Sequence, residues 1–370
     1  MQPPFLSSPP PSRGRLGGGA PTTYEQDIVA LGNGAVLPSE AGYFTKGNKV
    51  TALRGGQEIL DGILQSLTQA SSTIQLEMYW LTNKRIVDLM AKKARSGVSL
   101  RVLLDPSAPD DPEKKKEKAE AIRILSESGA EVRDYPTDSS KKQINHVKLL
   151  IVDGKAAIIG GMNWGNSSFA NEDADVLLEG PGVKQLQQLF REDWETSGGT
   201  LSAGPGRTSL QPEGSALTSA VSTSEKHRSY KAVVYRNLEE AKKKIHLAMY
   251  ALTDSKVIRM LVEAKNRGVD VKVLLDPNRY QDGGSPNDKT AKKLREEGVP
   301  VRWYRVKGNK LHAKLCIFDD REVIVGSGNW TYKGLNINRE IGLDVVSVPV
   351  AAAFLEMFGN DWKNAGEELP

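Results

Sequence analysis

Two segments of this chain each combine a base, a cation and an amide at the same spacing. The first segment holds His146, Lys148 and Asn163, and the second holds His312, Lys314 and Asn329. In an extended backbone, side chains two positions apart project from the same face, so each histidine shares a surface with its lysine. An imidazole can act as a nucleophile or a general base, and an ammonium and an amide can bind an anion. Each segment therefore predicts half of a site for an anionic substrate.

The two segments follow one pattern: H-x-K, four residues, D, six residues, and G-(S/G)-x-N. Asp153 and Asp319 lie where an apolar run gives way to polar residues, which predicts a hairpin turn that the aspartate braces. The following turn contains Gly160 and Gly161 in the first copy and Gly326 and Ser327 in the second. Backbone N–H groups of these turns could bind an oxyanion together with the asparagine amide. One H-x-K arises by chance, but two copies with identical internal spacing predict a functional site.

If the two copies meet, the combined site contains two imidazoles, two ammonium groups and two amides. These groups suit a phosphodiester, because the cations and amides would stabilise charge that develops on the phosphate oxygens. One histidine would attack phosphorus to give a phosphohistidine, and the other would protonate the leaving alcohol and later deprotonate the incoming water or alcohol. Two lysines would repel a divalent cation, and no cluster of Asp, Glu or Cys accompanies them. The residue types thus predict a reaction that needs neither a metal ion nor a cofactor.

The doubled motif, in which each copy ends in Asn-Trp, resembles the phospholipase D superfamily, whose signature is a paired H-x-K-x(4)-D followed by G-S-x-N. The resemblance covers most of residues 49–365 and implies the same metal-independent mechanism. In two-motif members the first motif usually supplies the nucleophile, which implies that His146 attacks phosphorus and that His312 is the acid/base. One departure from the signature is Gly161, where the family has serine.

The resemblance also implies a carboxylate downstream of the G-S-x-N turn that orients each histidine. Glu340 matches that position by its spacing from His312. The corresponding stretch of the first half is shorter, and there Asp173 overlays Glu340 best, with Glu172 as the alternative. A neutral imidazole needs such a partner to present one tautomer. Asp173 and Glu340 are therefore candidate catalytic residues.

The motifs belong to a longer internal repeat. Residues 74–106 and 245–277 align without a gap, and each reads as an apolar strand, a helix with apolar positions at helical spacing, and a second apolar strand. Gly97 and Gly268 are expected to end the two helices. Such a unit predicts a right-handed βαβ connection and a largely parallel sheet. We expect an α/β protein of two pseudo-twofold-related α/β/α sandwich repeats with mostly parallel or mixed sheets, which is the phospholipase D-like fold.

The composition along the chain divides it into four regions. They are a Pro/Gly/Ser-rich disordered leader (1–23), a first phospholipase D-like repeat with an N-terminal arm (24–196), a linker rich in Gly, Ser, Thr and Pro (197–229), and a second repeat (230–370). Each repeat contains a lysine-rich helix, at 112–128 or 287–297, and closes with a helix that contains FREDW or FGNDW. The lysine-rich helices are expected to present a solvated face.

The overall composition is that of an ordinary soluble globular protein, with 39% hydrophobic and 26% charged residues. The net charge of +4 allows an anionic partner but does not diagnose nucleic acid. Cys316 is the only cysteine, and its apolar setting predicts a packed thiol. No segment reads as a signal peptide or a transmembrane span, so we expect a cytoplasmic protein capable of peripheral membrane contact. With both half-sites on one chain, a monomer would suffice and no obligate protein partner is expected.

Some other polar and aromatic residues are expected to belong to the scaffold. These are His227, His246, Glu77, Tyr79 and Tyr250. The two histidines have no lysine two positions on, and the other three residues lie on the repeat strands. Trp164 and Trp330, which follow the asparagines, either line a substrate cleft or pack in the core.

Three functions are compatible with these observations. The leading hypothesis is a phospholipase D-type phosphodiesterase that hydrolyses or transfers phosphatidyl-like groups, because IQLEMYW and the FREDW segment resemble lipid-acting members. The alternative is a DNA phosphodiesterase, because AMYALTD, HAKLCIFD and GSGNWT resemble compact endonuclease members. The third is a non-catalytic protein that binds nucleic acid or another anion at a relict site. Retention of histidine, lysine and asparagine in both halves argues against the third, since binding alone does not need a nucleophile and an acid.

Overall fold

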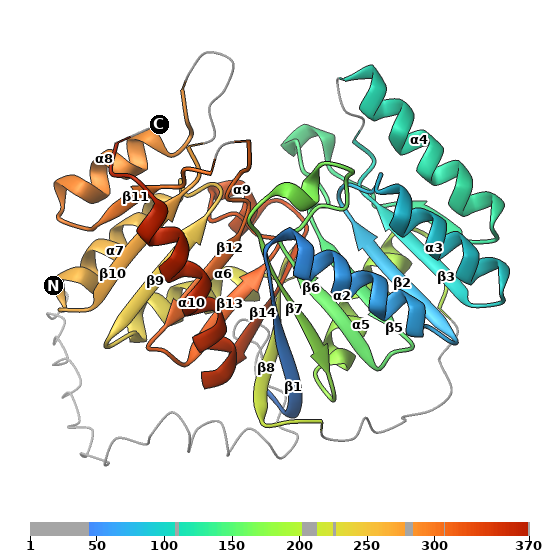
Figure 1. Ribbon diagram of the computed structural model, residues 1–370, viewed down its shortest axis with the longest axis horizontal. Helices are drawn as coiled ribbons and strands as arrows, with labels where there is room; N and C mark the ends of the chain where they lie inside the picture. Colours follow the sequence, from blue (N-terminus) through green and yellow to red (C-terminus); the bar gives the residue numbers. More distant parts are fainter. Residues whose placement is uncertain are drawn as a thin grey trace, which may run out of the picture.

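The computed structural model describes residues 44–107, 111–201, 213–224, 227–277, 284–306 and 308–368. The expected leader (1–23) and the part of the expected arm up to residue 43 lie outside these residues. Within the described chain, the two repeats have the same succession of strands and helices, and Figure 1 shows them side by side, the first in blue to green and the second in yellow to red.

The first half runs from β1 to α5. Its elements are β1 (Thr45–Arg54), α2 (Gly55–Gln69), β2 (Thr73–Met78), α3 (Lys84–Arg95), β3 (Ser99–Leu104), α4 (Pro112–Glu127), β4 (Glu131–Asp134), β5 (Lys148–Val152), β6 (Ala156–Gly160), β7 (Ala174–Glu179) and α5 (Val183–Thr196), with short 3-10 turns at Ser139–Lys141 and Ser168–Ala170.

The second half repeats this order from β8 to α10. Its elements are β8 (Ala216–Thr223), α6 (Ser229–Glu240), β9 (Lys244–Met249), α7 (Ser255–Asn266), β10 (Asp270–Leu275), α8 (Asp288–Glu296), β11 (Val301–Trp303), β12 (Lys314–Phe318), β13 (Glu322–Gly326), α9 (Tyr332–Asn336), β14 (Glu340–Val346) and α10 (Val348–Asn364).

The strands of both halves form one continuous sheet. Its order is β11-β10-β9-β12-β13-β14-β8-β1-β7-β6-β5-β2-β3-β4, so the halves join where β8 pairs with β1. Pairing is parallel only within β2-β3-β4 and β9-β10-β11, because each hairpin strand, β5 or β12, returns antiparallel to the first strand of the βαβ unit. The α/β fold class with mixed sheets is confirmed, and the expectation of a largely parallel sheet is wrong.

The boundary between the halves differs from the one expected from composition. Residues 216–223, inside the expected linker 197–229, form β8, a strand that pairs with β14 along its whole length and with β1 at its other edge. The second repeat therefore begins at β8 rather than at residue 230, and α6 begins at Ser229. The sequence ALTSAVST does not indicate a strand, because its small polar residues are typical of a linker. In the structure most of its side chains are buried.

Local sequence signals explain where the repeat helices begin and end. The Asn83 side chain accepts a hydrogen bond from the N–H of Ile86 at the start of α3, and the Asp254 side chain accepts from the N–H groups that open α7. Just beyond the two C-termini, Gly97 and Gly268 adopt φ values of 93° and 90°, which only glycine adopts without strain. These signals fix the length of each crossover helix and so where β3 and β10 begin.

The hydrophobic core has three parts. One part packs α2 and α3 on the first half of the sheet, and a second packs α6 and α7 on the second half. The third part is shared, since it combines residues of α5 and α10 with apolar side chains of strands from both halves. In this shared core α10 contacts β1 and α5 contacts β8, so the closing helix of each half covers the first strand of the other. These helix contacts across the junction fix the position of the hairpin β5–β6 relative to the hairpin β12–β13. Figure 1 shows the two hairpins on either side of the junction.

Candidate active site

The two motif histidines lie just before the first strand of their hairpins, His146 before β5 and His312 before β12. The backbone N–H of His146 donates to the carbonyl oxygen of Arg339 at 2.9 Å, and that of His312 donates to the carbonyl oxygen of Glu172 at 2.7 Å. Each acceptor belongs to the opposite half of the chain. The backbone itself therefore brings the two histidine segments together at the junction of the halves.

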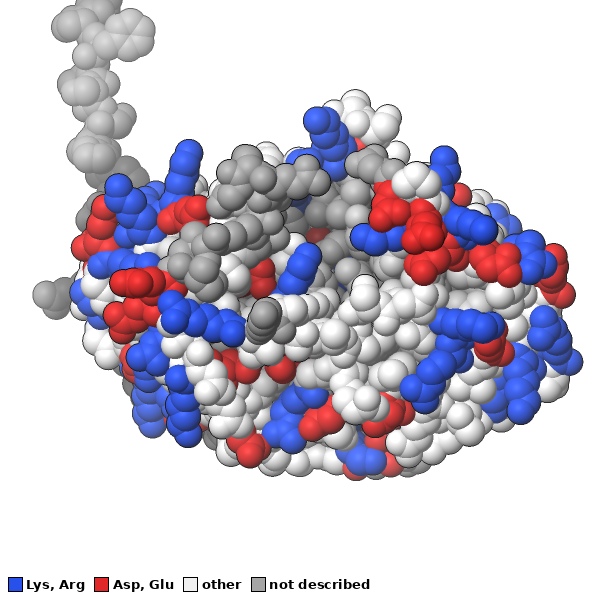
Figure 2. All heavy atoms as spheres, turned by 45° about the horizontal axis from the view of Figure 1, so that its top comes forward, with Lys and Arg blue, Asp and Glu red and all other residues white. Residues whose placement is uncertain are grey.

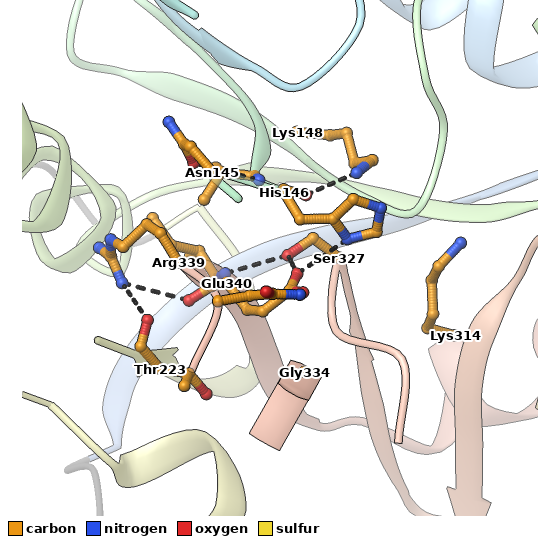
Figure 3. A network of polar contacts seen from close by, with 12 residues as sticks. Asn145, His146, Lys148, Thr223, Lys314, Ser327, Gly334, Arg339 and Glu340 are labelled. Atoms are coloured by element: carbon orange, nitrogen blue, oxygen red, sulfur yellow. Dashed lines mark hydrogen bonds and ion pairs between the residues drawn. The ribbon is translucent and has the colours of Figure 1, made fainter. Parts of the chain in front are cut away.

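The carboxylates that contact the histidines are exchanged between the halves in the same way. Nδ1 of His146 lies 3.1 Å from Oε2 of Glu340, and Nδ1 of His312 lies 2.7 Å from Oδ2 of Asp173. The spacing of Glu340 from His312 suggested a pairing within one half, and that pairing is wrong. Figure 3 shows Glu340 reaching from the second half to His146 of the first half. With Nδ1 held by a carboxylate, Nε2 of each ring is the nitrogen left for chemistry.

The two orienting carboxylates are supported differently. The hydroxyl of Ser327 and the amide of Asn338 donate to Glu340, at 2.5 and 3.1 Å. In the first half glycine replaces serine at position 161, and a Cβ added to Gly161 would lie only 2.2 Å from Oδ1 of Asp173. The shorter aspartate and the glycine thus belong together, because the aspartate carboxylate occupies the space that a serine side chain would need.

The two motif lysines are buried beside the histidines, with 2% of Lys148 and 1% of Lys314 exposed. Nζ of Lys148 donates to the carbonyl oxygen of His146 at 2.5 Å. Nζ of Lys314 donates to the carbonyl oxygen of His312 and also lies 3.0 and 3.1 Å from the two nitrogens of that ring. Two lysine side chains therefore lie beside the two imidazoles in a buried site.

Burial and mutual repulsion shift the titration of these four groups in one direction. Burial, followed by the charge of Lys314, lowers the pKa of His312 to about 3, and burial also lowers the pKa of His146. Burial lowers the pKa of Lys314 to about 8 and that of Lys148 well below its ordinary value. Both histidines are neutral at pH 7 in the free protein. A bound anion would reverse the repulsion, so the site is electrostatically suited to a phosphate group.

Asn163 and Asn329, the asparagines that end the two motifs, each have an unsatisfied side-chain oxygen. Both side chains are half-buried, and this oxygen is buried without a hydrogen-bond partner among the described residues. Buried polar groups normally find a partner, so these oxygens could accept a hydrogen bond from a ligand, while the amide nitrogens are the atoms that could donate one.

The backbone N–H groups of the motif turns do not point into the site as expected. The N–H of Ser327 donates to the carbonyl oxygen of Ile341 at 3.0 Å, and the N–H of Gly161 donates to the carboxylate of Asp175 at 2.8 Å. The prediction that these N–H groups would bind an oxyanion is therefore wrong, since neighbouring strands β14 and β7 use them. Gly160 and Gly326 end β6 and β13 and lie opposite these same strands.

The two motif aspartates lie at the hairpin turns, away from the histidines. Asp153 has a φ of 52° and accepts hydrogen bonds from the backbone N–H groups of residues 71–73. Asp319 has a φ of 50° and accepts from the N–H groups of residues 242–244. Each carboxylate ties its hairpin to the start of the neighbouring βαβ strand, β2 or β9.

Two tyrosines beside the site were assigned to the scaffold from sequence. The ring of Tyr79 lies 5.1 Å from the ring of His146 and 5.1 Å from Nζ of Lys148. Tyr250 makes the same two contacts with the histidine and lysine of its own half, at 4.9 and 5.4 Å. The signal that could have identified them is the repeated Met-Tyr at the end of the first repeat strand. They flank the site symmetrically and favour the cationic form of the lysines.

The remaining candidates from the sequence are structural. Trp164 and Trp330 are each 1% exposed and pack in the core, which excludes the cleft-lining alternative. Cys316 is fully buried, which raises the pKa of its thiol. The other two histidines pair with carboxylates elsewhere, His227 with Glu192 at 2.7 Å and His246 with Asp270 at 3.0 Å.

A buried ionic cluster lies behind His146. Nε of Arg339 donates to both carboxylate oxygens of Asp193, at 2.9 and 2.7 Å. Its Nη1 donates to the carbonyl oxygen of Thr223 at 3.2 Å, as Figure 3 shows. Glu77 is fully buried nearby, and burial, followed by the charge of Asp193, raises its pKa well above the ordinary value. The cluster fixes the segment that supplies both the carbonyl of Arg339 and the carboxylate of the next residue to His146.

The surface around the site carries charges of both signs. Figure 2 turns toward the viewer the end of the molecule at which α4 and α9 lie in Figure 1, and blue and red side chains are interspersed around a hollow between the halves. A separate cavity of about 800 Å³ is lined by Asp319 and Lys242 among others, at the far end of β12 from Lys314, and takes no part in this site. No group of three or more His, Cys, Asp or Glu among the described residues is arranged to hold a metal ion. Nor is any helix of that part of the chain both long and apolar enough to cross a membrane.

Two matching α/β halves that bring together a histidine and a lysine from each, with the orienting carboxylates exchanged between the halves, define a protein of the phospholipase D class. The model of the family described as "Cardiolipin synthase, PLD-like domain" matches residues 63–194 and 234–362, and the chain belongs to this family.

Similar proteins include cardiolipin synthases of bacteria. Cardiolipin synthase 1 of Bacillus anthracis is 24% identical over 347 residues, which cover 85% of this chain and 66% of that protein. The probable cardiolipin synthase YwiE of Bacillus subtilis (strain 168) is 25% identical over 321 residues, which cover 81% of this chain and 63% of that protein. The chain thus spans just under two thirds of the length of these curated relatives.

Solved structures share the fold at lower identity. Phosphatidylserine synthase of Haemophilus influenzae Rd KW20 matches with a TM-score of 0.64 and 13% identity, over 86% of this chain and 88% of that chain. Polyphosphate kinase of Porphyromonas gingivalis matches with a TM-score of 0.56 and 15% identity, over 85% of this chain and 47% of that chain. At these identities the likeness concerns the fold alone.

Proposed function

We propose that the protein is a phosphodiesterase of phospholipase D type that transfers phosphatidyl groups of phospholipids to an alcohol or to water through a phosphohistidine. The observation that carries the proposal is the exchange of carboxylates, in which Glu340 holds His146 and Asp173 holds His312. This exchange leaves Nε2 of each ring without a carboxylate partner, and on His312 this nitrogen lies 3.1 Å from Nζ of Lys314. Similarity to cardiolipin synthases supports a phospholipid as the substrate.

In the first step Nε2 of His146 attacks phosphorus, a P–N bond forms and the P–O bond to the leaving alcohol breaks. The leaving oxygen takes a proton from Nε2 of His312, which has been protonated because the bound phosphodiester raises its pKa. Lys148 and Lys314, together with the side-chain N–H groups of Asn163 and Asn329, bind the non-bridging oxygens.

In the second step Nε2 of His312 takes a proton from the incoming alcohol or water, whose oxygen attacks phosphorus. The P–N bond breaks, and its electron pair returns to Nε2 of His146, so both histidines regain their starting state. Asp173 and Glu340 stabilise the imidazolium forms through Nδ1. Two displacements at phosphorus give overall retention of configuration.

A substrate panel tests the proposal. Phosphatidylglycerol vesicles, an aryl phosphodiester, single- and double-stranded DNA, and RNA are each incubated with the protein in EDTA, with and without a primary alcohol. We expect turnover of the phospholipid and a transfer product with the alcohol. Turnover of DNA alone would replace the proposal by the nuclease alternative, and turnover of nothing in the panel would leave anion binding. Activity that required an added divalent ion would contradict metal independence.

Two variants separate the roles of the histidines. An aryl leaving group needs no proton, so His312→Ala should still release a burst of aryl alcohol equal to the amount of enzyme, whereas His146→Ala should not. On a phospholipid both variants should lose activity, by about 10²- to 10⁴-fold for the acid/base and more for the nucleophile. A burst from His146→Ala instead would exchange the two assignments.

A further inference from the structure

Asp175 is a buried carboxylate next to the site. It belongs to neither copy of the sequence motif. It lies on β7, is 1% exposed, and pairs in register with Gly160 of β6. Its Oδ1 accepts hydrogen bonds from the N–H of Gly161 at 2.8 Å and the N–H of Met162 at 3.1 Å. These two residues open the turn that ends at Asn163. The carboxylate therefore fixes the backbone that presents this amide.

Two carboxylates lie against the paired glycines of the turn and leave no room for a side chain at either position. A Cβ added to Gly160 would be 2.0 Å from Oδ1 of Asp175, and one added to Gly161 would be 2.2 Å from Oδ1 of Asp173. Asp175 thus lies against Gly160 of the first half, and Asp173, the partner of His312, lies against the adjacent Gly161. The segment from Asp173 to Asp175 therefore contacts both the turn that presents Asn163 in the first half and the histidine of the second half.

The second half solves the same structural problem without a carboxylate. Gly342 occupies the register position opposite Gly326, and the ring of Tyr230 from α6 fills the space beside it. A Cβ on Gly342 would lie 2.7 Å from this ring, and one on Gly328 would lie 3.0 Å from it. Packing beneath the turn therefore does not demand a charged group, and burying Asp175 beside Asp173 costs free energy.

We propose that Asp175 is a positioning residue of the reaction, which holds the N–H groups of Gly161 and Met162 so that the amide of Asn163 faces the phosphate. The assignment rests on the proposed function for its chemistry but has a structural readout of its own. Burial, followed by the charge of Asp173, raises the pKa of Asp175 to about 7. At pH 6 the carboxyl is mostly protonated, so asparagine is its close substitute there.

Three variants test this role at pH 6. Asp175→Asn keeps an acceptor oxygen for the two N–H groups, whereas Asp175→Ala removes it. We expect kcat of Asp175→Ala to fall about 10- to 100-fold with KM changed less than threefold, since a small displacement of a catalytic group costs about this much. Asp175→Asn should recover kcat to within about threefold of wild type. The control is Asp344→Asn, a change at a fully buried aspartate of β14 that pairs with Arg236 at 2.7 Å, outside the site. It should lower stability and leave kcat unchanged.

Amide hydrogen exchange of the peptide containing residues 161–163 supplies the readout that needs no turnover. Exchange there should become faster in Asp175→Ala than in wild type, and remain slow in Asp175→Asn and Asp344→Asn. The role is overturned if Asp175→Ala keeps the wild-type kcat and exchange pattern, or if Asp175→Asn is as impaired as the alanine variant. If wild type turned over none of the panel, the proposed function would fail while the exchange pattern still decided whether Asp175 holds the turn.

Discussion

At the scale of single residues, the exchanged carboxylates assign a separate task to each half. In the proposed mechanism, the contact of Glu340 with Nδ1 of His146 leaves Nε2 as the nitrogen that attacks. The contact of Asp173 with Nδ1 of His312 likewise leaves Nε2 of that ring as the nitrogen that gives and takes the proton. Burial raises the pKa of each carboxyl, but the charge of the neighbouring lysine and the hydrogen bond from the histidine are among the effects that outweigh burial, so both pKa values lie below the ordinary carboxyl value. Both groups are therefore ionised at neutral pH and able to stabilise an imidazolium.

Substituting an amide for each of these two carboxylates should slow different steps of the reaction. Glu340→Gln should slow formation of the phosphohistidine about 100-fold with every substrate, because the nucleophile loses its fixed tautomer. Asp173→Asn should slow phospholipid turnover by a similar factor but leave the aryl alcohol burst near the wild-type rate, since that step needs no acid. Burst kinetics with an aryl phosphodiester measure both. Equal effects of the two substitutions on the burst would show that the carboxylates do not act on separate histidines.

At the scale of elements, the helices and hairpins were predictable because their signals are local. Periodic apolar residues, the caps at Asn83 and Asp254, and Gly97 and Gly268 lie within the segments that they define. The mixed sheet was not predictable in the same way. The antiparallel return of β5 against β2 joins residues far apart in sequence, and the apolar run of β5 is equally compatible with either direction.

The candidate site shows the same division. The pattern of histidine, lysine and asparagine is local, so the residues of each half could be chosen from the sequence alone. Which carboxylate meets which histidine depends on how β7 and β14 approach the opposite half, and spacing along the chain carries no such information. Asp175 was missed because a single aspartate in a strand has no motif, and its importance lies in N–H groups that only the folded turn presents.

Asp153 at the β5–β6 turn provides a test at this scale. It accepts hydrogen bonds from three successive N–H groups and adopts a left-handed conformation that alanine tolerates poorly. Asp153→Ala should lower the free energy of unfolding by about 2–4 kcal/mol in denaturant titrations. Activity per folded molecule should stay within about twofold of wild type. A loss of kcat in protein that remains fully folded would instead place Asp153 in the chemistry.

At the scale of the whole molecule, the two backbone contacts that hold the histidine segments are alike in hydrogen bonding, but the side chains of the two acceptor residues carry opposite charges. The carbonyl groups of Arg339 and Glu172 make equivalent hydrogen bonds to the two histidine segments. The side chain of Arg339 forms a buried ion pair with Asp193. The side chain of Glu172 forms no ion pair with any described residue, and the like-charged Asp361 is one of its electrostatic neighbours. One contact is thus stabilised by ionisation and the other is weakened by it.

This difference predicts a pH dependence of stability. Burial, followed by the charge of Asp361, raises the pKa of Glu172 to about 8. A carboxyl with a raised pKa in the folded state favours folding fully only below its unfolded-state pKa, near 4.3, and that contribution is lost as pH rises to about 8. Glu172→Gln cannot ionise, so its stability should exceed that of wild type by at least about 1 kcal/mol at pH 9 and should equal it at pH 4. Thermal unfolding across this range measures the difference. Glu356→Gln, at an exposed acid that pairs with Arg54 nearby, is the control and should follow the wild-type curve. If the stability of Glu172→Gln differed from that of wild type by the same amount at every pH, the carboxyl of Glu172 would not have a raised pKa in the folded protein.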